Sequence, residues 1–250
     1  MDWFIVYATG SLSIFIFGLS KSGFGSGFGV IAVPLFALVA PINTVVATLL
    51  PVLLVADAVS LRAYWGTWQW RDLLPIIPAG FIGIMLGWLV FGFINPQHVR
   101  LLIGLITLSF CAWQLLGYVL KLSEIAFLKS RTFAWLASLA SGFTSTIAHA
   151  GAPPISIYLL AKRFGKMDFL ALSVAYFAFL NLVKLVPYWH LGFFNSANLS
   201  LSLMMAPFAV LGAYAGLHLR DKIPTRPFFW LIYGGLIVTG LKLTFDGLTG

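Results

Sequence analysis

Charged residues are scarce in this sequence. Asp, Glu, Lys and Arg make up only 9% of its 250 residues, whereas soluble domains contain about 25%. Hydrophobic residues make up 60%. A soluble domain of this size buries only about three quarters of its surface, so it could not cover so much apolar surface. The composition excludes an ordinary soluble domain and predicts a protein whose main partner is the lipid bilayer.

Cysteine is nearly absent as well. The single Cys111 excludes a disulfide framework, and with only 4 histidines the sequence contains no pattern typical of a thiolate metal cluster. It also has no HExxH or GxSxG motif and no glycine-rich run that ends in Gly-Lys-Ser/Thr, as a phosphate loop does. We therefore expect no metal, no cofactor and no enzymatic activity, and we rank an intramembrane enzyme last among the function classes.

Positive charge exceeds negative charge. The sequence holds 15 Lys and Arg against 7 Asp and Glu, a net charge of +8. In a soluble protein this excess would indicate nucleic-acid binding, but in a membrane protein it indicates basic loops on the cytoplasmic side. We therefore expect no nucleic-acid partner.

Long apolar runs predict an all-α, polytopic membrane fold. Because a crossing takes about 20 helical residues, two of the ten runs are too short for a straight span, and the prediction is eight to ten transmembrane helices with the first pair of each half short or broken. The ten segments are 3–20, 27–40, 44–63, 73–94, 98–120, 132–147, 150–161, 168–190, 197–219 and 226–245. The short segments 27–40 and 150–161 leave three connectivities open: ten crossings, a returning hairpin at the start of each half, or one broken span per pair.

The basic residues distinguish these connectivities. Ten crossings or returning hairpins place most of them on one side, and the hairpins differ only in moving Lys21 into the membrane, whereas fused spans give no bias. The residues of this side are Lys21, Arg62, Arg71, Lys121, Lys129, Arg131, Lys162, Arg163, Lys166, Arg220, Lys222 and Arg226. The positive-inside rule therefore predicts both termini on the outer, periplasmic side.

The two halves of the chain resemble each other. SGFGS at 22–26 matches SGFTS at 141–145 with an offset of 119, and the Tyr-Trp pair at 64–65 matches that at 188–189 with an offset of 124. Five segments per half turn the second copy upside down, which predicts the inverted-topology repeat typical of secondary transporters. We expect an N-terminal transmembrane repeat at 1–120, a cytoplasmic linker at 121–131 and a C-terminal transmembrane repeat at 132–250.

A GxxxG pattern also recurs in both halves. Gly83 and Gly87 match Gly212 and Gly216 at an offset of 129. Such glycines allow close helix approach. The pattern leaves open whether they join the two repeats or two protomers of a homodimer.

Glycine- and proline-rich stretches interrupt the first pair of segments in each half. Alternate glycines at 23–29 each cost about 1 kcal/mol of helix propensity, and SGFTSTIAHAGAPP occupies 141–154. We expect both stretches to be unwound, which a membrane tolerates only inside protein or beside a wet cavity. Free N–H groups and hydroxyls there would bind an anion, although small residues also serve close packing. The candidates are Ser22, Gly25, Ser26, Gly27, Ser145, Thr146 and Gly151.

Few ionisable or strongly polar residues lie inside the segments. Asp57 and Asn181 occupy equivalent mid-depth positions at an offset of 124, and Lys184 follows Asn181 by one helical turn. Intramembrane polar residues of this kind indicate function. We expect Lys184 and Asn181 to bind substrate, Lys184 to be neutralised by Asp57 or by a bound anion, and Asp57 to carry a coupling proton or pair with a lysine.

Lys21 and His149 are further candidates near the two glycine-rich stretches. Lys21 would balance charge or bind substrate, but an interfacial lysine that reaches toward water explains it slightly better. His149 would bind substrate or transfer a proton, and the alternative is a neutral histidine satisfied by backbone groups.

The sequence resembles one known family. GSGFGVIAVPLFAL at 25–38 and AGAPPISIYLL at 150–160 are similar to the paired signatures of the TauE/SafE sulfite exporter family, and Asn181, Lys184 and Tyr188 resemble its later polar motif. Phe28, where a third consecutive glycine is common, and Ala152 depart from the pattern and bear on substrate preference. The resemblance covers nearly the whole chain. It implies transport of small sulfur oxyanions or organosulfonates, typically outward, across a bacterial inner membrane.

These observations predict a secondary transporter that serves sulfur metabolism. We expect it to export sulfite or an organosulfonate such as sulfoacetate by alternating access around a midplane site at the two helix breaks. The alternative is a passive anion channel, which would show flux without saturation.

Overall fold

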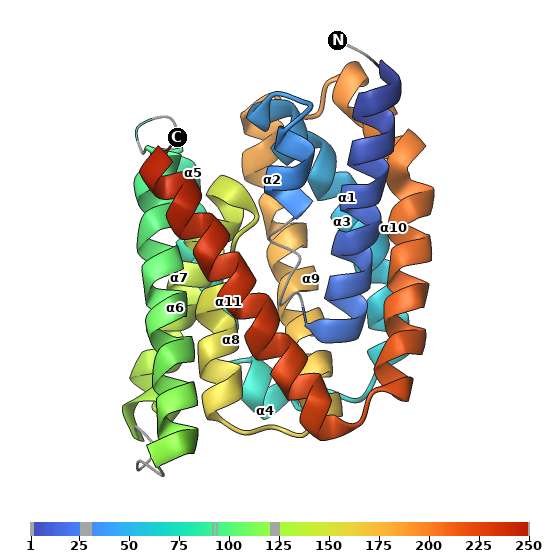
Figure 1. Cartoon of the computed structure of the whole chain (residues 1–250). Coiled ribbons are helices and arrows are strands. Elements are labelled where there is room, and N and C mark those ends of the chain that lie inside the picture. Colours follow the sequence, from blue (N-terminus) through green and yellow to red (C-terminus); the bar gives the residue numbers. More distant parts are fainter. Residues whose placement is uncertain (1–2, 26–31, 92, 94, 121–125, 250) are drawn as a thin grey trace.

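The computed structural model describes residues 3–25, 32–91, 93, 95–120 and 126–249. Every regular element in these ranges is helical, as predicted (Figure 1). The elements are α1 (Trp3–Phe24), α2 (Ala32–Ala37), α3 (Ile42–Tyr64), α4 (Trp70–Leu73), α5 (Ile77–Val90), α6 (Pro96–Leu120), the single 3₁₀ turn η2 (Ala126–Lys129), α7 (Arg131–Ala148), α8 (Ala152–Ala161), α9 (Lys166–His190), α10 (Ser196–Lys222) and α11 (Thr225–Thr249).

Helix length and composition confirm a polytopic membrane protein. Among the described residues, four helices are long and apolar enough to cross a bilayer, namely Phe4–Phe24, Asn43–Tyr64, Lys166–His190 and Ser196–Lys222. Two shorter apolar helices, Ile77–Val90 and Ala152–Ala161, accompany them. Many large apolar side chains on the outside of the bundle are exposed, as lipid contact requires.

The helix break in the second half is shorter than the sequence predicts. We expected the whole stretch 141–154 to be unwound, but α7 continues through Ala148 and α8 begins at Ala152. The chain turns at His149, whose φ of 49° is left-handed. Residues 141–148 are helical, and Gly142 lets α7 pack closely against α5, since a methyl group there would lie 2.1 Å from the Gly80 carbonyl oxygen. In the first half, the predicted break at 23–29 also starts later than expected, because α1 runs through Phe24. Residues 26–29 of that break lie outside the described residues.

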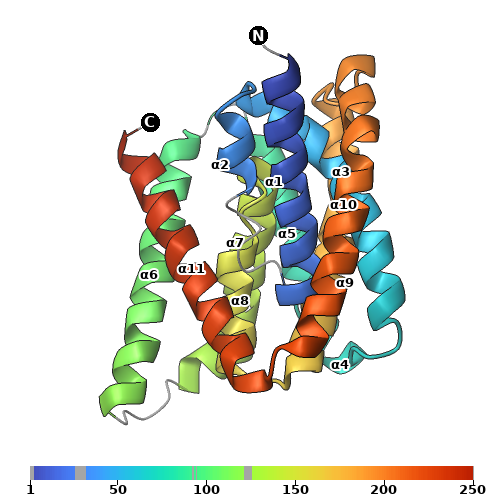
Figure 2. The ribbon, with the colours of Figure 1, turned by 45° about the vertical axis from the view of Figure 1, so that its right-hand side comes forward.

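The first two helices of each half form a returning hairpin. With ten residues, α8 is about 15 Å long, too short for a bilayer of about 30 Å. It contacts η2, which precedes α7, so the chain returns to the end from which α7 starts. In the same way, α2 lies at the end where α1 begins (Figures 1 and 2). Of the three connectivities that the sequence left open, the structure therefore has the returning hairpins, which take Lys21 into the membrane.

Both termini lie at the same end of the bundle, and α4 lies at the opposite end (Figure 1). The start of α10 belongs to the terminal end, because the Tyr7 hydroxyl donates to the Met204 carbonyl (3.4 Å). The loops before α4 and before α10 therefore lie at opposite ends of the molecule.

The two halves exchange partners in their packing. Helix α1 packs on α10, α5 packs on α7, α3 packs on α9, and α6 packs on α11. A methyl group on Gly212 would lie 2.2 Å from the Phe15 carbonyl oxygen, and one on Gly83 would lie 2.1 Å from that of Leu139. The GxxxG glycines thus join the two halves of one chain.

These contacts also fix how the halves correspond. Gly83 and Gly212 are equivalent in the two halves, so the residues that they contact, Leu139 and Phe15, should be equivalent too. Leu139 and Phe15 are 124 positions apart in the sequence. The predicted offset of 119 for the first helix of each half is therefore wrong by five residues. The SGFGS and SGFTS matches do not occupy equivalent places.

Candidate functional site

An ion pair lies where α1 meets α3. The Lys21 ammonium is 2.7 Å from Asp57 Oδ1, and the Asn181 amide on α9 donates to Asp57 Oδ2 at 2.7 Å. All three side chains are buried, with at most 3% of either ion-pair side chain exposed. Lys21 is therefore no interfacial lysine, and its pairing with Asp57 replaces the explanation that the sequence favoured. The structure joins Asp57 and Asn181, which the repeat places at equivalent positions.

A second cation lies on the other side of Asn181. Lys184 donates to the Ser145 hydroxyl at 3.0 Å and to the Ser145 carbonyl at 3.4 Å, and its ammonium is 3.1 Å from His149 Nδ1. Lys184 has no exposed surface. Among the residues that the structure describes, no carboxylate forms an ion pair with it, because Asp57 pairs with Lys21 instead.

His149 is held on both ring nitrogens. Its Nε2 lies 3.1 Å from the Val46 carbonyl of α3, while Nδ1 faces Lys184. A carbonyl only accepts and an ammonium only donates, so the contacts require a neutral ring with the proton on Nε2. Tyr188 supports this arrangement by donating to the Thr146 carbonyl at 2.9 Å, with its hydroxyl 3.4 Å from Nε2. The neutral ring agrees with a histidine satisfied in part by backbone.

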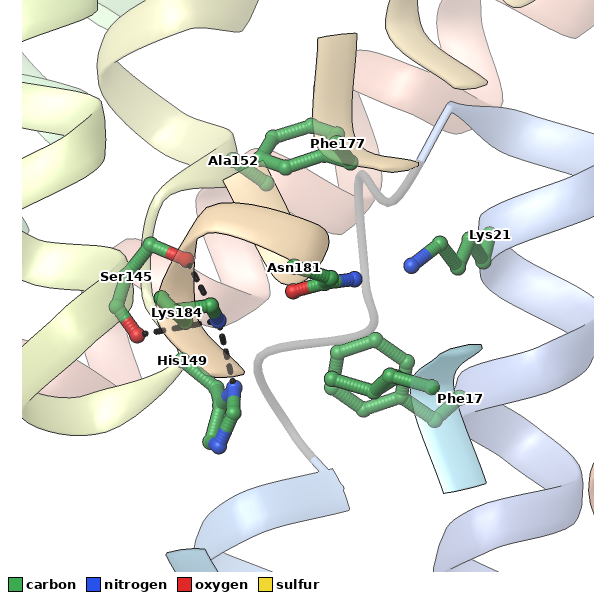
Figure 3. Close-up of a pocket in the computed structure, with 9 residues that line it drawn as sticks. Phe17, Lys21, Ser145, His149, Ala152, Phe177, Asn181 and Lys184 are labelled. Atoms are coloured by element: carbon green, nitrogen blue, oxygen red, sulfur yellow. Dashed lines mark hydrogen bonds between the residues drawn. The ribbon is translucent and has the colours of Figure 1, made fainter. Parts of the chain in front are cut away.

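A small cavity separates the two lysines. Figure 3 shows Lys21 facing the group of Lys184, Ser145 and His149 from the opposite side, with Asn181 between them. The cavity volume open to the centre of a water molecule is about 20 Å³, which holds about one water. The described residues that line it are Phe17, Lys21, Leu53, Ser145, His149, Ala152, Phe177, Asn181 and Lys184. In this conformation the site is closed, and a larger anion requires the helices to separate.

The amino end of α8 reaches the cavity with few backbone donors. Ala152 lines it, but Pro153 and Pro154 at the start of the helix lack N–H groups. The expected donor set at this helix end is therefore much reduced. Positive charge at the cavity comes mainly from the lysine side chains.

Two predicted site residues with hydroxyl groups, Ser22 and Thr146, do not line the cavity. The Ser22 hydroxyl donates to the carbonyls of Gly18 and Ala213, and the Thr146 hydroxyl donates to that of Gly142. The Ser22 hydroxyl thus joins α1 to α10, whereas the Thr146 hydroxyl bonds to its own helix α7.

The glycines have structural roles of a different kind. Gly25 has a φ of 63° and lies against Phe169, and the Gly151 carbonyl accepts from Ser141 at 2.6 Å. The predicted contacts Ser26 and Gly27 lie outside the described residues.

Sequence reasoning missed the apolar walls of the cavity. Phe17, Leu53 and Phe177 line it. Each precedes a polar residue of the site by four positions on its own helix, Phe17 before Lys21, Leu53 before Asp57 and Phe177 before Asn181. Because residues four apart share a helix face, this spacing was the signal that could have found them.

Nothing in the described part of the chain resembles a metal centre, because no three His, Cys, Asp or Glu side chains gather there. The arrangement offers two buried ammonium groups, an amide and a hydroxyl around a small cavity. These groups suit the binding of a small anion.

Comparison with known families identifies one match. The model of the sulfite exporter TauE/SafE family matches residues 11–243. The chain belongs to this family. The TauE/SafE match covers α3, α7 and α9 in full and α1 from residue 11, so it includes every described residue of the site. No match was found among curated proteins or among solved structures.

Proposed function

We propose that this TauE/SafE protein is a secondary transporter that exports a small sulfur-containing anion, sulfite or an organosulfonate such as sulfoacetate. One observation carries the proposal: Lys184 is a fully buried cation with no carboxylate partner among the described residues, and it faces a cavity. Charge inside a membrane protein is costly unless it is paired. A bound anion supplies the missing partner.

The residues around Lys184 have definite parts in this proposal. The ammonium would bind an anionic oxygen, the Ser145 hydroxyl would donate a hydrogen bond, and the Asn181 amide would orient the substrate from the side of Asp57. His149 holds the position of Lys184 through Nδ1. Asp57 would balance the charge of Lys21, so that only Lys184 requires a counter-ion.

The closed cavity favours a transporter over a channel. A channel needs a continuous wet path, whereas the space beside Lys184 holds about one water. We infer that residues 1–120 and 132–250 are inverted repeats joined by a cytoplasmic linker at 121–131, and that rocking between them opens the site to each side in turn. Close glycine contacts at the α1–α10 and α5–α7 interfaces would allow such movement.

Charge placement supports an orientation in a bacterial inner membrane. Arg71, Lys162, Lys166 and Lys222 lie on loops or helix ends on the side of α4, opposite the termini. Under the positive-inside rule this side is cytoplasmic and both termini are periplasmic. Export would then be driven by the membrane potential, because the inside is negative.

Flux through purified protein in liposomes tests the proposal. We expect saturable sulfite flux with countertransport, loss of most flux in Lys184→Ala and a marked reduction in Asn181→Ala. The surface variant Lys222→Ala is the matched control and should transport normally. Flux without saturation or countertransport would identify a channel. Unchanged saturable flux in both site variants would show that the substrate binds elsewhere.

A further inference from the structure

We propose that the site is selective for singly charged anions, because its buried groups leave one positive charge for the substrate to neutralise. This inference rests on the proposed anion transport and concerns the charge of the substrate. With both lysines protonated and Asp57 ionised, as their contacts suit, Lys21 and Lys184 contribute two positive charges and Asp57 contributes one negative charge. The constellation therefore carries a net charge of one.

Among the described residues, no other group at the cavity changes this count. The contacts of His149 with the Val46 carbonyl and with the Lys184 ammonium leave its ring neutral. The Tyr188 hydroxyl donates a hydrogen bond to the Thr146 carbonyl and keeps its proton, so it is neutral. The remaining lining residues are Phe17, Leu53, Ser145, Ala152, Phe177 and Asn181, and none of them carries a charge.

Both carboxylate oxygens of Asp57 already have partners within the protein. Its two oxygens face Lys21 and Asn181 at 2.7 Å each. Lys21 is thus already neutralised before substrate arrives, and a single anionic charge beside Lys184 completes the balance. A doubly charged substrate would leave one unpaired negative charge at a site enclosed by Phe17, Leu53 and Phe177, where water is too scarce to stabilise it.

The inference divides the proposed substrates. Hydrogensulfite and sulfonates with no second acidic group carry one charge, whereas sulfate and sulfoacetate carry two. The first group fits the charge of the site. The second would have to bring a proton or a cation with it.

Methanesulfonate and sulfate provide a matched test. Both are tetrahedral around sulfur and similar in size, but sulfate has a second negative charge where methanesulfonate has a methyl group. Each would be added as a competitor of radiolabelled sulfite uptake into proteoliposomes at one fixed pH. We expect methanesulfonate to inhibit at a concentration about tenfold or more below that of sulfate. Equal inhibition by the two would overturn the inference.

Variants that change the charge of the site sharpen this test. Asp57→Asn raises the net charge to two at nearly constant shape, so sulfate should become the better competitor. The double variant Lys21→Met/Asp57→Asn returns the net charge to one and should restore the preference for methanesulfonate. If the preference between methanesulfonate and sulfate is the same in the wild type and in both variants, the inference is also overturned.

Failure of the inference and failure of the proposed function give different results. If the wild-type protein moves no anion of either charge, the transport proposal fails. If it moves both classes equally well, transport stands and only the charge selectivity fails. The competition between methanesulfonate and sulfate is measured on the wild-type protein. It therefore tests the inference even if Asp57→Asn folds poorly.

Discussion

The two halves of the molecule pack alike but distribute their charges differently. At an offset of 124, the Tyr64 hydroxyl donates to the Ser22 carbonyl at 2.6 Å and the Tyr188 hydroxyl donates to that of Thr146 at 2.9 Å. The left-handed turns after α1 and α7, at Gly25 and His149, correspond in the same way. Backbone architecture is therefore shared between the halves down to single hydrogen bonds.

The polar residues at the centre break this correspondence. Asp57 corresponds to Asn181, and Ser60 to the cation Lys184. Lys21 corresponds to Ser145. Each half thus has one lysine and one serine, with the lysine on the first helix of the first half, α1, and on the third helix of the second half, α9. The lysine of the first half has a carboxylate partner, whereas that of the second half has none among the described residues. In the proposed transport cycle, the shared packing would support movement between the halves, and the unequal charges would place the anion beside Lys184.

The largest expected effect comes from the pair Lys21 and Ser145. Lys21→Ala leaves the Asp57 carboxylate buried without its cation, which costs about 3–5 kcal/mol. The equivalent Ser145→Ala removes one hydrogen bond from Lys184 and should cost about 1–3 kcal/mol. Thermal unfolding of both variants in one detergent measures the difference.

The double variant Lys21→Met/Asp57→Asn is the control for this prediction. It removes both charges together, so it should be more stable than Lys21→Ala. If Lys21→Ala unfolds at the temperature of the wild type, the ion pair does not stabilise the fold.

The glycine interfaces should respond equally in the two halves. Gly83→Ala and Gly212→Ala each push a methyl group into a backbone carbonyl, at 2.1 and 2.2 Å. Overpacking of this kind costs about 1–3 kcal/mol. Gly234→Ala is the matched control, because no atom lies within 4 Å of its added methyl group, and it should leave the unfolding temperature unchanged or slightly raised. A large effect in only one half would show that the two interfaces are not equivalent.

The sequence was informative about helices and depth, and less so about helix rotation. Apolar run length located the spans, and the Tyr-Trp match gave the offset that brings Asp57 and Asn181 to corresponding positions, where the structure joins them. The offset of 119 was wrong because serine and glycine recur in such segments and match easily by chance. The contacts of Gly83 and Gly212, which only the folded structure supplies, correct it.

The partners of the polar residues also required the structure. Lys21 lies in the membrane only if α1 and α2 form a returning hairpin, and the loop charges alone left that connectivity open. Because of the rotation of α1 and α7, the Ser22 hydroxyl bonds to α10 and the Thr146 hydroxyl bonds to its own helix. One-dimensional spacing could not distinguish that rotation from one that faces the cavity.

The two tyrosines should contribute similarly to stability and unequally to transport. Tyr64→Phe and Tyr188→Phe each remove one hydrogen bond between helices, worth about 0.6 kcal/mol on average in membrane proteins. Only Tyr188 also lies near His149, at 3.4 Å from Nε2, whereas Tyr64 lies under Arg220 at 4.4 Å. We expect Tyr188→Phe to raise the KM for sulfite and Tyr64→Phe to leave it near the wild-type value. Equal changes in KM would mean that the His149 side of the cavity has no special part in binding.

The smallest expected effect is at Ser60, the counterpart of Lys184. Its hydroxyl donates to the Ala56 carbonyl of its own helix at 2.7 Å, and such a bond contributes little to helix stability. Ser60→Ala should change the free energy of unfolding by about 0.5 kcal/mol or less, because alanine also has the better helix propensity. Sulfite flux should stay at the wild-type level, measured beside Lys184→Ala in the same liposomes. A loss of flux in Ser60→Ala would place substrate contacts on both sides of Asp57, and the anion site would then be as symmetric as the packing around it.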